Sequence, residues 1–197
     1  MPRRARPEAV ECRFGGEHVM FTARLRIQSA RWSDHVRATH LARDEPARYW
    51  LGWAPEDTRP EPYPDGLDPL LVEPELLSFV GADLRTVLLL ANITLMGCFD
   101  GAYDVGGLID PTVRGEGYGT EALDAVCRLA HHHLGIVHLH AGCDADNVVS
   151  RRWLASCEFE EIGVSPYTLP DGRVTDAVWW LREDITAKRR CRNLMVA

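Results

Sequence analysis

The sequence lacks an excess of positive charge and has no long apolar run. Its 197 residues carry 22 Lys and Arg against 29 Asp and Glu, a net charge of −7. This balance excludes a protein that coats nucleic acid, because phosphate contacts need clustered cations. No stretch approaches the roughly 18 apolar residues of a membrane span, and no signal-peptide run follows the N-terminal arginines. We therefore expect a cytoplasmic protein with no nucleic-acid or membrane partner.

The six cysteines also lack a recognisable pattern. They contain no C-x-x-C pair, and a chain of this length needs no disulfides for stability. We predict that they are reduced core residues. Histidines 131–133 are consecutive, and consecutive helical residues point about 100° apart, so this run cannot by itself surround a zinc ion. We predict no metal site, with His133 packed in the core and the other histidines facing solvent or a groove.

What the sequence does contain is a succession of strand and helix patterns typical of an α+β fold. A helix is expected from an N-cap at Ser33 to Arg43, and a longer one over residues 118–134, closed by Gly135. A short third helix, capped by Asp146 or Asn147, should reach Ser156. The expected strands cover residues 21–27, 76–80, 86–99, 103–109, 136–143, 159 onward and 174–181.

The order of these elements predicts a mixed sheet. The dipeptide Asp100-Gly101 and the segment 170–172 predict hairpin turns, so most neighbouring strands should be antiparallel. The strands at 103–109 and 136–143 are joined through a helix, and such strands are usually parallel. Five prolines between residues 54 and 69 predict an irregular loop. The acidic excess over residues 44–75 either attracts a cationic amine or is a solvated loop.

The segment 110–120 reads D-P-T-V-R-G-E-G-Y-G-T and separates an apolar strand from an amphipathic helix. Its glycines let backbone N–H groups converge on an anion, and the start of the helix adds free donors and a positive dipole end. Arg114 adds a cation, so a pyrophosphate fits. The spacing is not the dinucleotide fingerprint, and no lysine precedes Thr120 as a Walker loop requires. As a bare pattern, a structural turn fits equally well.

This segment and a second one give the chain a family resemblance. R-G-E-G-Y-G-T-E-A-L from Arg114 is followed by D-A-D-N-V-V-S-R-R-W-L from Asp144, by Phe159 and by D-G-R-V-T-D from Asp171. With these motifs the chain resembles the GNAT superfamily of acyl-CoA-dependent N-acyltransferases, in particular the branch of Rim-type ribosomal-protein N-terminal acetyltransferases. The resemblance covers about residues 22–184. We expect residues 1–197 to form one domain of this type.

The resemblance implies a central mixed, mostly antiparallel sheet, flanked by helices, whose two parallel central strands splay apart. Acetyl-CoA, or another short acyl-CoA, would be the co-substrate, with no metal. Its pantetheine arm would pair with the backbone of Leu108, Ile109 and Asp110 and contact Asn147. The residues implied for the pyrophosphate are Val113, Arg114, Gly115, Glu116, Gly117, Tyr118, Gly119 and Thr120.

Two side chains are the candidates for proton transfer. Asp104 stands where many Rim-type relatives have a glutamate, and is either the acceptor of the amine proton or an exposed strand carboxylate. Ser150 matches a position that can protonate the departing thiolate, or it bonds a carbonyl of its own helix. The tyrosine acid of other branches would fall at Leu154. Glu158 replaces the usual glycine before Phe159, so we expect a differently built turn there.

The expected function is an acetyl-CoA-dependent N-acetyltransferase acting on a small amine or on a peptide N-terminus. At pH 7, deprotonating a lysine costs about 4.6 kcal/mol and an α-amine about 1 kcal/mol, so an α-amine needs little general base. The alternative is a non-catalytic acyl-CoA-binding or regulatory domain. Trp50, Trp53 and Tyr63 either line an acceptor pocket or anchor a loop. A homodimer is left open.

Overall fold

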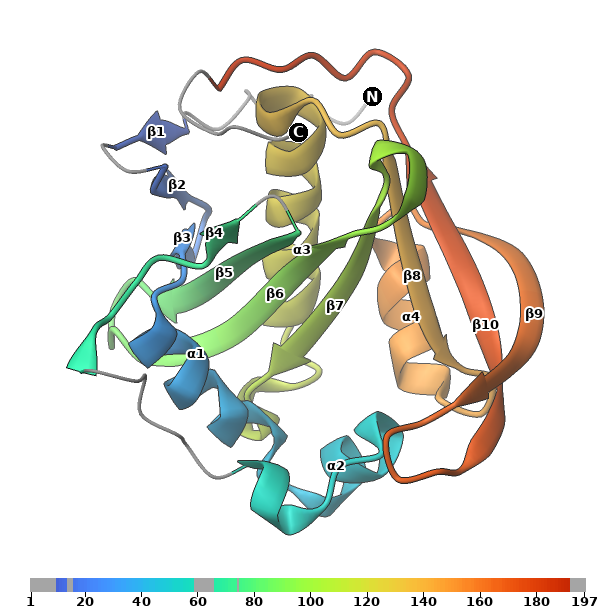
Figure 1. Ribbon diagram of the computed structural model, residues 1–197. Coiled ribbons are helices and arrows are strands. Elements are labelled where there is room, and N and C mark those ends of the chain that lie inside the picture. The colour runs from blue at the N-terminus through green and yellow to red at the C-terminus, as the bar shows by residue number, and fades with distance from the viewer. Residues whose placement is uncertain (1–9, 14–15, 59–65, 74, 192–197) are drawn as a thin grey trace.

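The structure is a computed structural model that describes residues 10–13, 16–58, 66–73 and 75–191. Its strands are β1 (Glu11–Cys12), β2 (His18–Phe21), β3 (Leu25–Ser29), β4 (Val72–Glu73), β5 (Leu76–Asp83), β6 (Leu89–Gly97), β7 (Tyr103–Ile109), β8 (His138–Asp144), β9 (Glu160–Thr168) and β10 (Val174–Glu183). They form one ten-stranded sheet in the order β1-β2-β3-β5-β6-β7-β8-β10-β9, with β4 beside β5 (Figure 1). The predicted mostly antiparallel sheet is confirmed.

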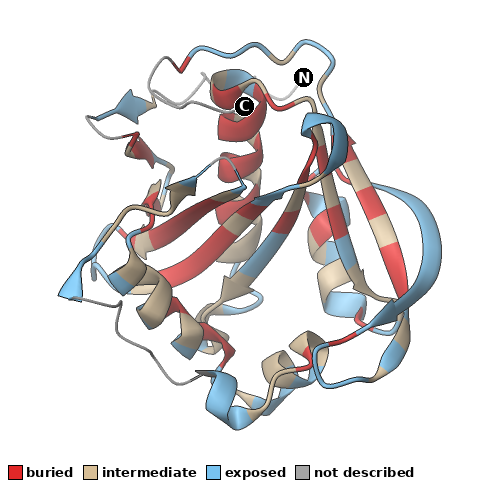
Figure 2. Cartoon of the chain, viewed as in Figure 1, coloured by how far each residue is buried: buried red, intermediate tan, exposed pale blue. Residues whose placement is uncertain are grey.

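Helices flank this sheet on both faces. They are α1 (Trp32–Ala38), η1 (Thr39–Ala42), α2 (Glu45–Leu51), η2 (Pro55–Thr58), η4 (Phe99–Gly101), η5 (Pro111–Val113), α3 (Tyr118–Leu129), the π-helical η6 (Ala130–Leu134) and α4 (Val148–Ser156). Figure 1 shows α3 and α4 behind the sheet and α1 in front of it. The apolar stripe of α3 supplies the centre of the core, and Figure 2 shows it buried.

The N-terminal region differs most from the sequence prediction. The single strand expected over residues 21–27 is two strands, because the chain turns at residues 22–24 and the Thr22 N–H bonds the Leu25 carbonyl at 2.9 Å. Leu25 and Ile27 do share one buried face, as predicted. Residues 1–20, which showed no pattern, contribute β1 and part of β2.

Two helix predictions also needed correction. Ser33 is not the N-cap of α1, which begins one residue earlier; its N–H and hydroxyl instead bond the Asp68 carboxylate at 2.8 and 3.0 Å. The prediction ended this helical region at Arg43 and missed α2. Pro46 in its first turn is compatible with a helix there, because the N–H that proline lacks has no partner at a helix start.

The turn before β9 keeps a left-handed residue without glycine. Glu158 has φ 63° at the position where the sequence analysis expected a differently built turn, so that expectation is wrong. Its carboxylate lies 3.2 Å from the guanidinium of Arg182. Gly135, at φ 80°, ends η6 as predicted.

The parallel strands β7 and β8 are paired over only two residue pairs, Tyr103 with Leu139 and Asp104 with His140. Beyond these pairs β7 stays bonded to β6 as far as Ile109, and β8 stays bonded to β10 as far as Asp144. The two strands therefore diverge, as Figure 1 shows, and the splayed central pair implied by the resemblance is confirmed. No helix of the described part is long and apolar enough to cross a membrane.

Candidate functional site

Where β7 and β8 diverge, they leave a gap between them. The hydrogen bonds from β7 to β6 show which backbone groups of β7 point the other way, into this gap. The Asp110 N–H donates to the Leu90 carbonyl at 2.8 Å, beside β6. Because backbone groups alternate in direction along an antiparallel strand, Leu108 is also turned toward β6. The groups directed into the gap then belong to Ile109, Gly107 and Val105. Of the three residues expected to pair with a pantetheine arm, only Ile109 presents its backbone there.

Trp153 of α4 occupies the wall of this gap. A Cβ added to Gly107 would lie 2.8 Å from the indole ring, and one added to Gly119 would lie 3.3 Å from Nε1, so both glycines make room for the ring. The indole N–H is buried and has no hydrogen-bond partner among the described residues. An unsatisfied buried donor costs about 1–3 kcal/mol, so the packing of the ring against the two glycines must offset this cost. No sequence pattern pointed to Trp153 in particular.

Residues 110–120, here called the glycine segment, lie at the open end of the gap, its foot. This segment has the geometry of an anion site. Gly115 and Gly117 have φ of 82° and 84°, a conformation that costs other residues strain, and Gly117 is the N-cap of α3. The first bond of the helical ladder runs from the Glu121 N–H to the Gly117 carbonyl at 3.1 Å. The N–H groups of Tyr118, Gly119 and Thr120 precede this bond, as the donors of a free helix start do.

Two amides of the predicted pyrophosphate set are already engaged. The Val113 N–H donates to the Asp110 carbonyl at 3.1 Å, and the Glu116 N–H donates to the Val113 carbonyl at 3.3 Å. These bonds shape the turn. The remaining predicted donors of the segment are the backbone amides of Arg114, Gly115, Gly117, Tyr118, Gly119 and Thr120.

A cation beside this segment comes from Arg24, which the sequence analysis missed. Its Nη1 donates to the Glu116 carbonyl at 2.9 Å, and its guanidinium lies 4.0 Å from the centre of the Tyr118 ring. Its Nε donates to the Glu121 carboxylate at 2.6 Å. Reading residues 21–27 as one uninterrupted strand hid the turn that carries Arg24 to this position.

The Glu121 carboxylate ties this turn to the first turn of α3. It accepts hydrogen bonds from the Thr22 hydroxyl at 2.5 Å and from the Arg24 N–H at 2.8 Å. Burial opposes ionisation of Glu121, but these hydrogen bonds hold its pKa below the usual value. The charged carboxylate thereby fixes the N-terminus of α3 relative to β3.

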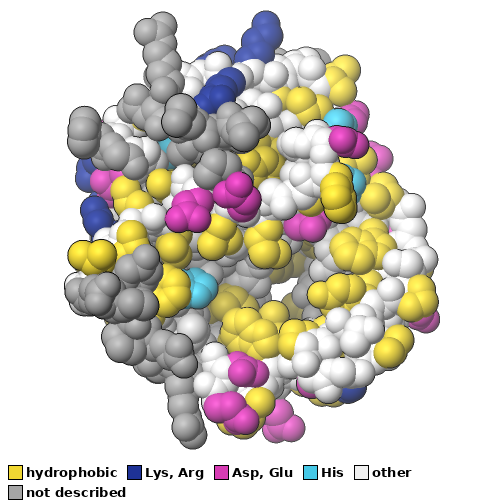
Figure 3. Space-filling view, in the orientation of Figure 1, with side chains coloured by type: hydrophobic (Ala, Val, Ile, Leu, Met, Phe, Trp, Pro, Cys, Tyr) yellow, Lys and Arg dark blue, Asp and Glu magenta, His cyan; other side chains and the backbone are white. Residues whose placement is uncertain are grey.

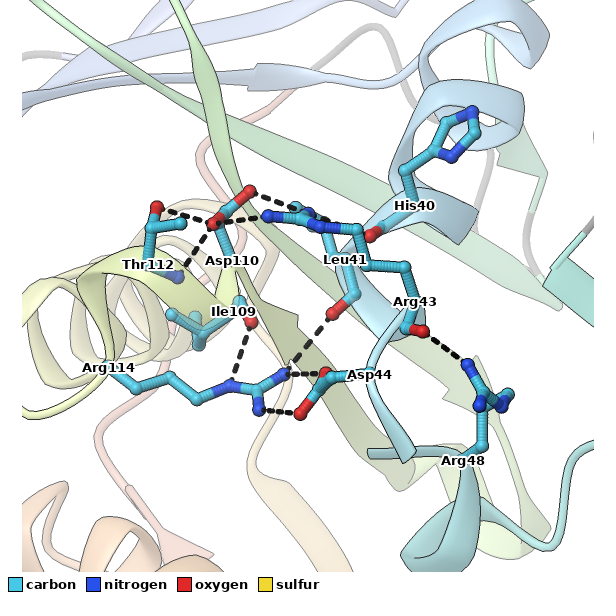
Figure 4. Close-up of polar contacts among 9 residues, drawn as sticks. All are labelled: His40, Leu41, Arg43, Asp44, Arg48, Ile109, Asp110, Thr112 and Arg114. Atoms are coloured by element: carbon cyan, nitrogen blue, oxygen red, sulfur yellow. Dashed lines mark hydrogen bonds and ion pairs between the residues drawn. The ribbon is translucent and has the colours of Figure 1, made fainter. Parts of the chain in front are cut away.

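Figure 4 shows two ion pairs, Arg114 with Asp44 and Asp110 with Arg43, that attach the glycine segment to the chain between η1 and α2. The Arg114 guanidinium donates to both carboxylate oxygens of Asp44, at 2.6 and 2.9 Å, and also to the carbonyls of Leu41 and Ile109. It is therefore engaged with the chain, and the expected phosphate contact of this side chain stays a prediction. Asp44 belongs to the acidic stretch, so part of that acidity is used internally.

Asp110 is likewise a structural residue of the turn. Its carboxylate accepts from the Thr112 N–H at 2.8 Å and from the Arg43 guanidinium at 3.0 and 3.2 Å. Burial would raise the pKa of Asp110, but the hydrogen bonds from Arg43 and Thr112 lower it to about 2. Its backbone is engaged on both sides, so Asp110 shapes the turn.

We expect the Asp110→Asn variant to show how much this charge contributes. Because the folded pKa is about 2 and the ordinary value 3.8, the contribution is complete above about pH 4 and is lost as the pH falls toward 2. The free energy of unfolding should fall by about 1–2 kcal/mol at pH 7, and the difference should vanish near pH 2. Urea titrations across this range measure it. Asp146→Asn, at an exposed position, is the control, and a difference that persists at pH 2 would contradict the electrostatic explanation.

The second motif forms the start of α4 on the other side of the gap. The Asn147 side-chain oxygen accepts the Ser150 N–H at 3.1 Å, which confirms the predicted cap and leaves the amide NH₂ for a ligand. Ser150 is half-buried, and its hydroxyl has no hydrogen bond to a carbonyl of α4 among the described contacts. Leu154 is buried in the core, where it carries no proton-transfer group.

Asp104 lies next to His140 at the closed end of the gap, its apex, where β7 and β8 are still paired. The two residues are the last partners of the parallel pair, so their side chains leave the same face of the sheet from strands about 4.8 Å apart. Burial and then the nearby charge of Asp104 raise the pKa of the Cys98 thiol. Asp104 is half-buried rather than exposed. His140 was expected only to face solvent or a groove; the structure adds it as a second candidate base.

Near the open end of the gap, α2 and the β9–β10 hairpin contact each other (Figure 1). Arg173 donates to the Tyr49 carbonyl, and its guanidinium lies 4.1 Å from the centre of the Tyr49 ring. Figure 3 shows this face hollowed, with hydrophobic side chains around the opening. A groove of about 390 Å³ lies at the contact. Its lining residues are Glu45, Arg48, Tyr49, Trp53, Pro55, Asp171 and Arg173.

The aromatic residues proposed for an acceptor pocket have different surroundings in the structure. Trp53 lines the groove, whereas Trp50 packs edge-on against Tyr49 with ring centres 4.9 Å apart. Tyr63 lies outside the described residues. One of the three is thus placed at a surface that an acceptor can reach.

The cysteines and histidines are placed differently from the prediction. All six cysteines are free, as expected, but only Cys127, Cys157 and Cys191 are buried. Among histidines 131–133 the packed residue is His131, whose Nδ1 lies 2.7 Å from the Ile136 carbonyl, and not His133. His133 instead contacts residues near both ends of the described chain.

Comparisons with known proteins agree with this geometry. The family model described as acetyltransferase (GNAT) domain matches residues 24–160. No curated protein gives a significant match. Similar solved structures include a GNAT-family acetyltransferase from Bacillus anthracis, with TM-score 0.67, 18% identity and coverage of 84% of this chain and 98% of that one.

Two further solved structures have acceptors in their names. Ribosomal-protein-S5-alanine acetyltransferase from Vibrio fischeri has TM-score 0.69 and 15% identity, and the match covers 86% of this chain and 98% of that one. Spermidine N-acetyltransferase from Vibrio cholerae, solved with CoA and spermine, has TM-score 0.64 and 14% identity, with coverage of 82% and 96%. At these identities the likeness shows a shared fold.

Proposed function

Because the chain belongs to the GNAT acetyltransferase family, we propose that it transfers an acetyl group from acetyl-CoA directly to a primary amine of a small molecule or of a peptide N-terminus. The observation that carries this proposal is the pair of splayed strands β7 and β8, whose gap ends at the glycine segment before α3. An unpaired strand edge can bond an amide-containing arm, and the helix start can bind its phosphates. We further propose that the domain extends over residues 1–197.

The cofactor would lie along β7. Its pyrophosphate would accept hydrogen bonds from the amides of residues 114, 115 and 117–120, with the Arg24 guanidinium beside them. Its pantetheine arm would pair with the gap-facing backbone of Ile109 and Gly107 and contact the amide of Asn147. Each hydrogen bond to a charged oxygen contributes about 1.5–3 kcal/mol.

The reaction would take place at the apex of the gap. The neutral amine attacks the thioester carbonyl, a C–N bond forms and the C–S bond breaks. Asp104, directly or through water, accepts the proton that the amine loses, and the adjacent His140 is the second candidate for this step. Ser150 would pass a proton to the departing thiolate and regain one from solvent, while Asp104 releases to solvent the proton taken from the amine, so that both side chains return to their starting state. From Asp110 to Asp104 the strand rises about 20 Å, the length that the arm must span.

The acceptor is proposed only as a class. The groove between α2 and the last hairpin carries the carboxylates of Glu45 and Asp171 and the guanidiniums of Arg48 and Arg173. Its balance of charges does not select a polycation. This balance supports an acceptor that pairs an amine with neutral or mixed-charge groups, as a peptide N-terminus does.

A thiol-release assay tests the proposed activity. The protein is incubated with acetyl-CoA and a panel of peptides with free N-termini, polyamines and aminoglycosides, and the released thiol is titrated. Acceptor-dependent thiol, together with an acetylated acceptor in the mass spectrum, supports the proposal. Tight acetyl-CoA binding in calorimetry without thiol release from any acceptor would favour the non-catalytic alternative.

A further inference from the structure

A cluster of four sulfur and nitrogen donors lies at the end of α3 opposite the glycine segment. It comprises Cys12 of β1, His18 of β2, His133 of η6 and Cys191 after β10, and we name it the terminal cluster. One ligand atom from each residue lies within 4.8 Å of all the others. These residues come from both ends of the described chain, and none of them belongs to the proposed acyl-transfer site.

The spacing of these donor atoms is close to that of a tetrahedral site. With Zn–S of about 2.3 Å and Zn–N of about 2.0–2.1 Å, a tetrahedron separates two sulfurs by about 3.8 Å and a sulfur from a nitrogen by about 3.6 Å. The Sγ atoms of Cys12 and Cys191 are 3.8 Å apart. The Nε2 of His18 lies 3.3 Å from the Cys191 Sγ, and the Nε2 of His133 lies 2.8 Å from the Cys12 Sγ, so an ion would move these pairs apart by about 0.3 and 0.8 Å.

The donors are held in place by neighbouring polar groups. The Nδ1 of His18 is 3.5 Å from the Ser29 hydroxyl, and Ser29 also accepts the His18 N–H at 3.0 Å. On the other side, the His133 carbonyl accepts the N–H groups of Arg190 and Cys191 at 2.9 and 3.0 Å. Supporting contacts of this kind orient the ligands of metal sites.

The chain after β10 passes close over the end of the helix. A Cβ on Gly135 would lie 2.6 Å from the Arg189 nitrogen, so only glycine allows this approach. The same glycine has φ 80°. Gly135 therefore lets the backbone pass close enough to the helix end to place Cys191 beside His133.

We propose that the terminal cluster binds one zinc ion through two thiolates and two imidazoles and that this ion is structural. Two sulfur and two nitrogen ligands in a tetrahedron are the donor set that zinc prefers. All four positions are filled by protein, which leaves no open position for a substrate. Binding replaces the S–H bonds of both cysteines by S–Zn bonds and releases two protons to solvent, so the thiolates neutralise the ion.

Such an ion would fasten the β1–β2 hairpin and the segment at Cys191 to η6. The helix from Tyr118 to Leu134 separates the cluster from the glycine segment by about 25 Å. Zinc removal should therefore lower stability and leave acetyl-CoA affinity nearly unchanged. This separation lets the proposal be tested apart from the acyl-transfer function.

The test measures zinc in the full-length, tag-free protein. After equilibration with zinc and dialysis, elemental analysis should give about one zinc per chain, and Co²⁺ substitution should give the visible bands of a tetrahedral thiolate site. Cys12→Ser and Cys191→Ser should each weaken zinc binding more than about 100-fold. Cys98→Ser and His132→Ala, which alter residues of the same types outside the cluster, should leave it unchanged.

Thermal unfolding supplies the second measurement. Zinc should raise the Tm of the wild type and of both control variants but not that of the cluster variants, while calorimetry with acetyl-CoA verifies that every variant is folded. Absence of stoichiometric zinc in the reduced wild type would overturn the proposal, as would equal losses in the control variants. A mass lower by two hydrogen atoms in non-reduced protein, with no zinc bound after reduction, would instead identify a disulfide between Cys12 and Cys191.

Discussion

Replacing Gly117 with valine should weaken acetyl-CoA binding by at least about 100-fold. The residue has φ 84° as the N-cap of α3, and a Cβ there would lie 3.4 Å from the Arg24 guanidinium. A β-branched side chain strongly disfavours that conformation, so the amides before Glu121 should turn away from a common point. Losing two hydrogen bonds to charged oxygens costs about 3 kcal/mol or more, equivalent to about 100-fold in Kd. Calorimetric titration with acetyl-CoA measures it.

Gly101→Val provides the matched control for backbone strain. Gly101 also has positive φ, at 73°, in the turn before β7, and nothing lies within 4 Å of an added Cβ. Strain at such a position costs about 1–3 kcal/mol of stability, and Gly101 lies outside the proposed phosphate site. Its acetyl-CoA affinity should stay near the wild-type value. If Gly117→Val binds acetyl-CoA as tightly as Gly101→Val does, the pyrophosphate is not held by this segment.

We expect Asp104→Asn to lower kcat by about 10²–10⁴-fold and to leave acetyl-CoA affinity unchanged. Asparagine keeps the size of the side chain but cannot accept the amine proton. Asp104 is half-buried at the apex of the gap, while the proposed phosphate contacts lie at its foot. Steady-state thiol release with a saturating peptide acceptor measures the rate, and calorimetry measures binding.

Two further variants decide how the result is interpreted. Asp100→Asn, in the turn that precedes β7, removes an exposed carboxylate and should keep the wild-type rate. His140→Ala tests the neighbouring imidazole, the Cα partner of Asp104. An unchanged rate in Asp104→Asn together with a large loss in His140→Ala would assign proton acceptance to His140. Unchanged rates in both variants would remove general-base catalysis by these residues from the mechanism.

Features that depend on neighbouring residues could be predicted from the sequence. Strand alternation and the helical stripe of α3 follow from local periodicity, and the cap at Asn147 and the stop at Gly135 follow from local backbone chemistry. Failures at this level were also local. The start of α2 was missed although Pro46 is compatible with it, and a seven-residue alternating pattern concealed the turn at Arg24.

The candidate site was predicted in part. The segment 110–120 could be found because the glycines and the helix start adjoin in sequence. The directions of its polar groups could not be found, because they depend on partners elsewhere. Arg114 reaches Asp44 across 70 positions, and Asp110 reaches Arg43 across 67. Such ion pairs form between turns that only the folded sheet brings together.

By itself the sequence determined most of the strands and helices and the glycine segment, since each depends on residues close together in the chain. The tertiary structure decided that β7 and β8 separate after Asp104 and His140, and which backbone groups face the gap. It alone brought Cys12 to Cys191 across 179 positions and to His133 across 121. Hydrophobic periodicity in the sequence cannot reveal such pairs, because the sheet and α3 fix the distance between them.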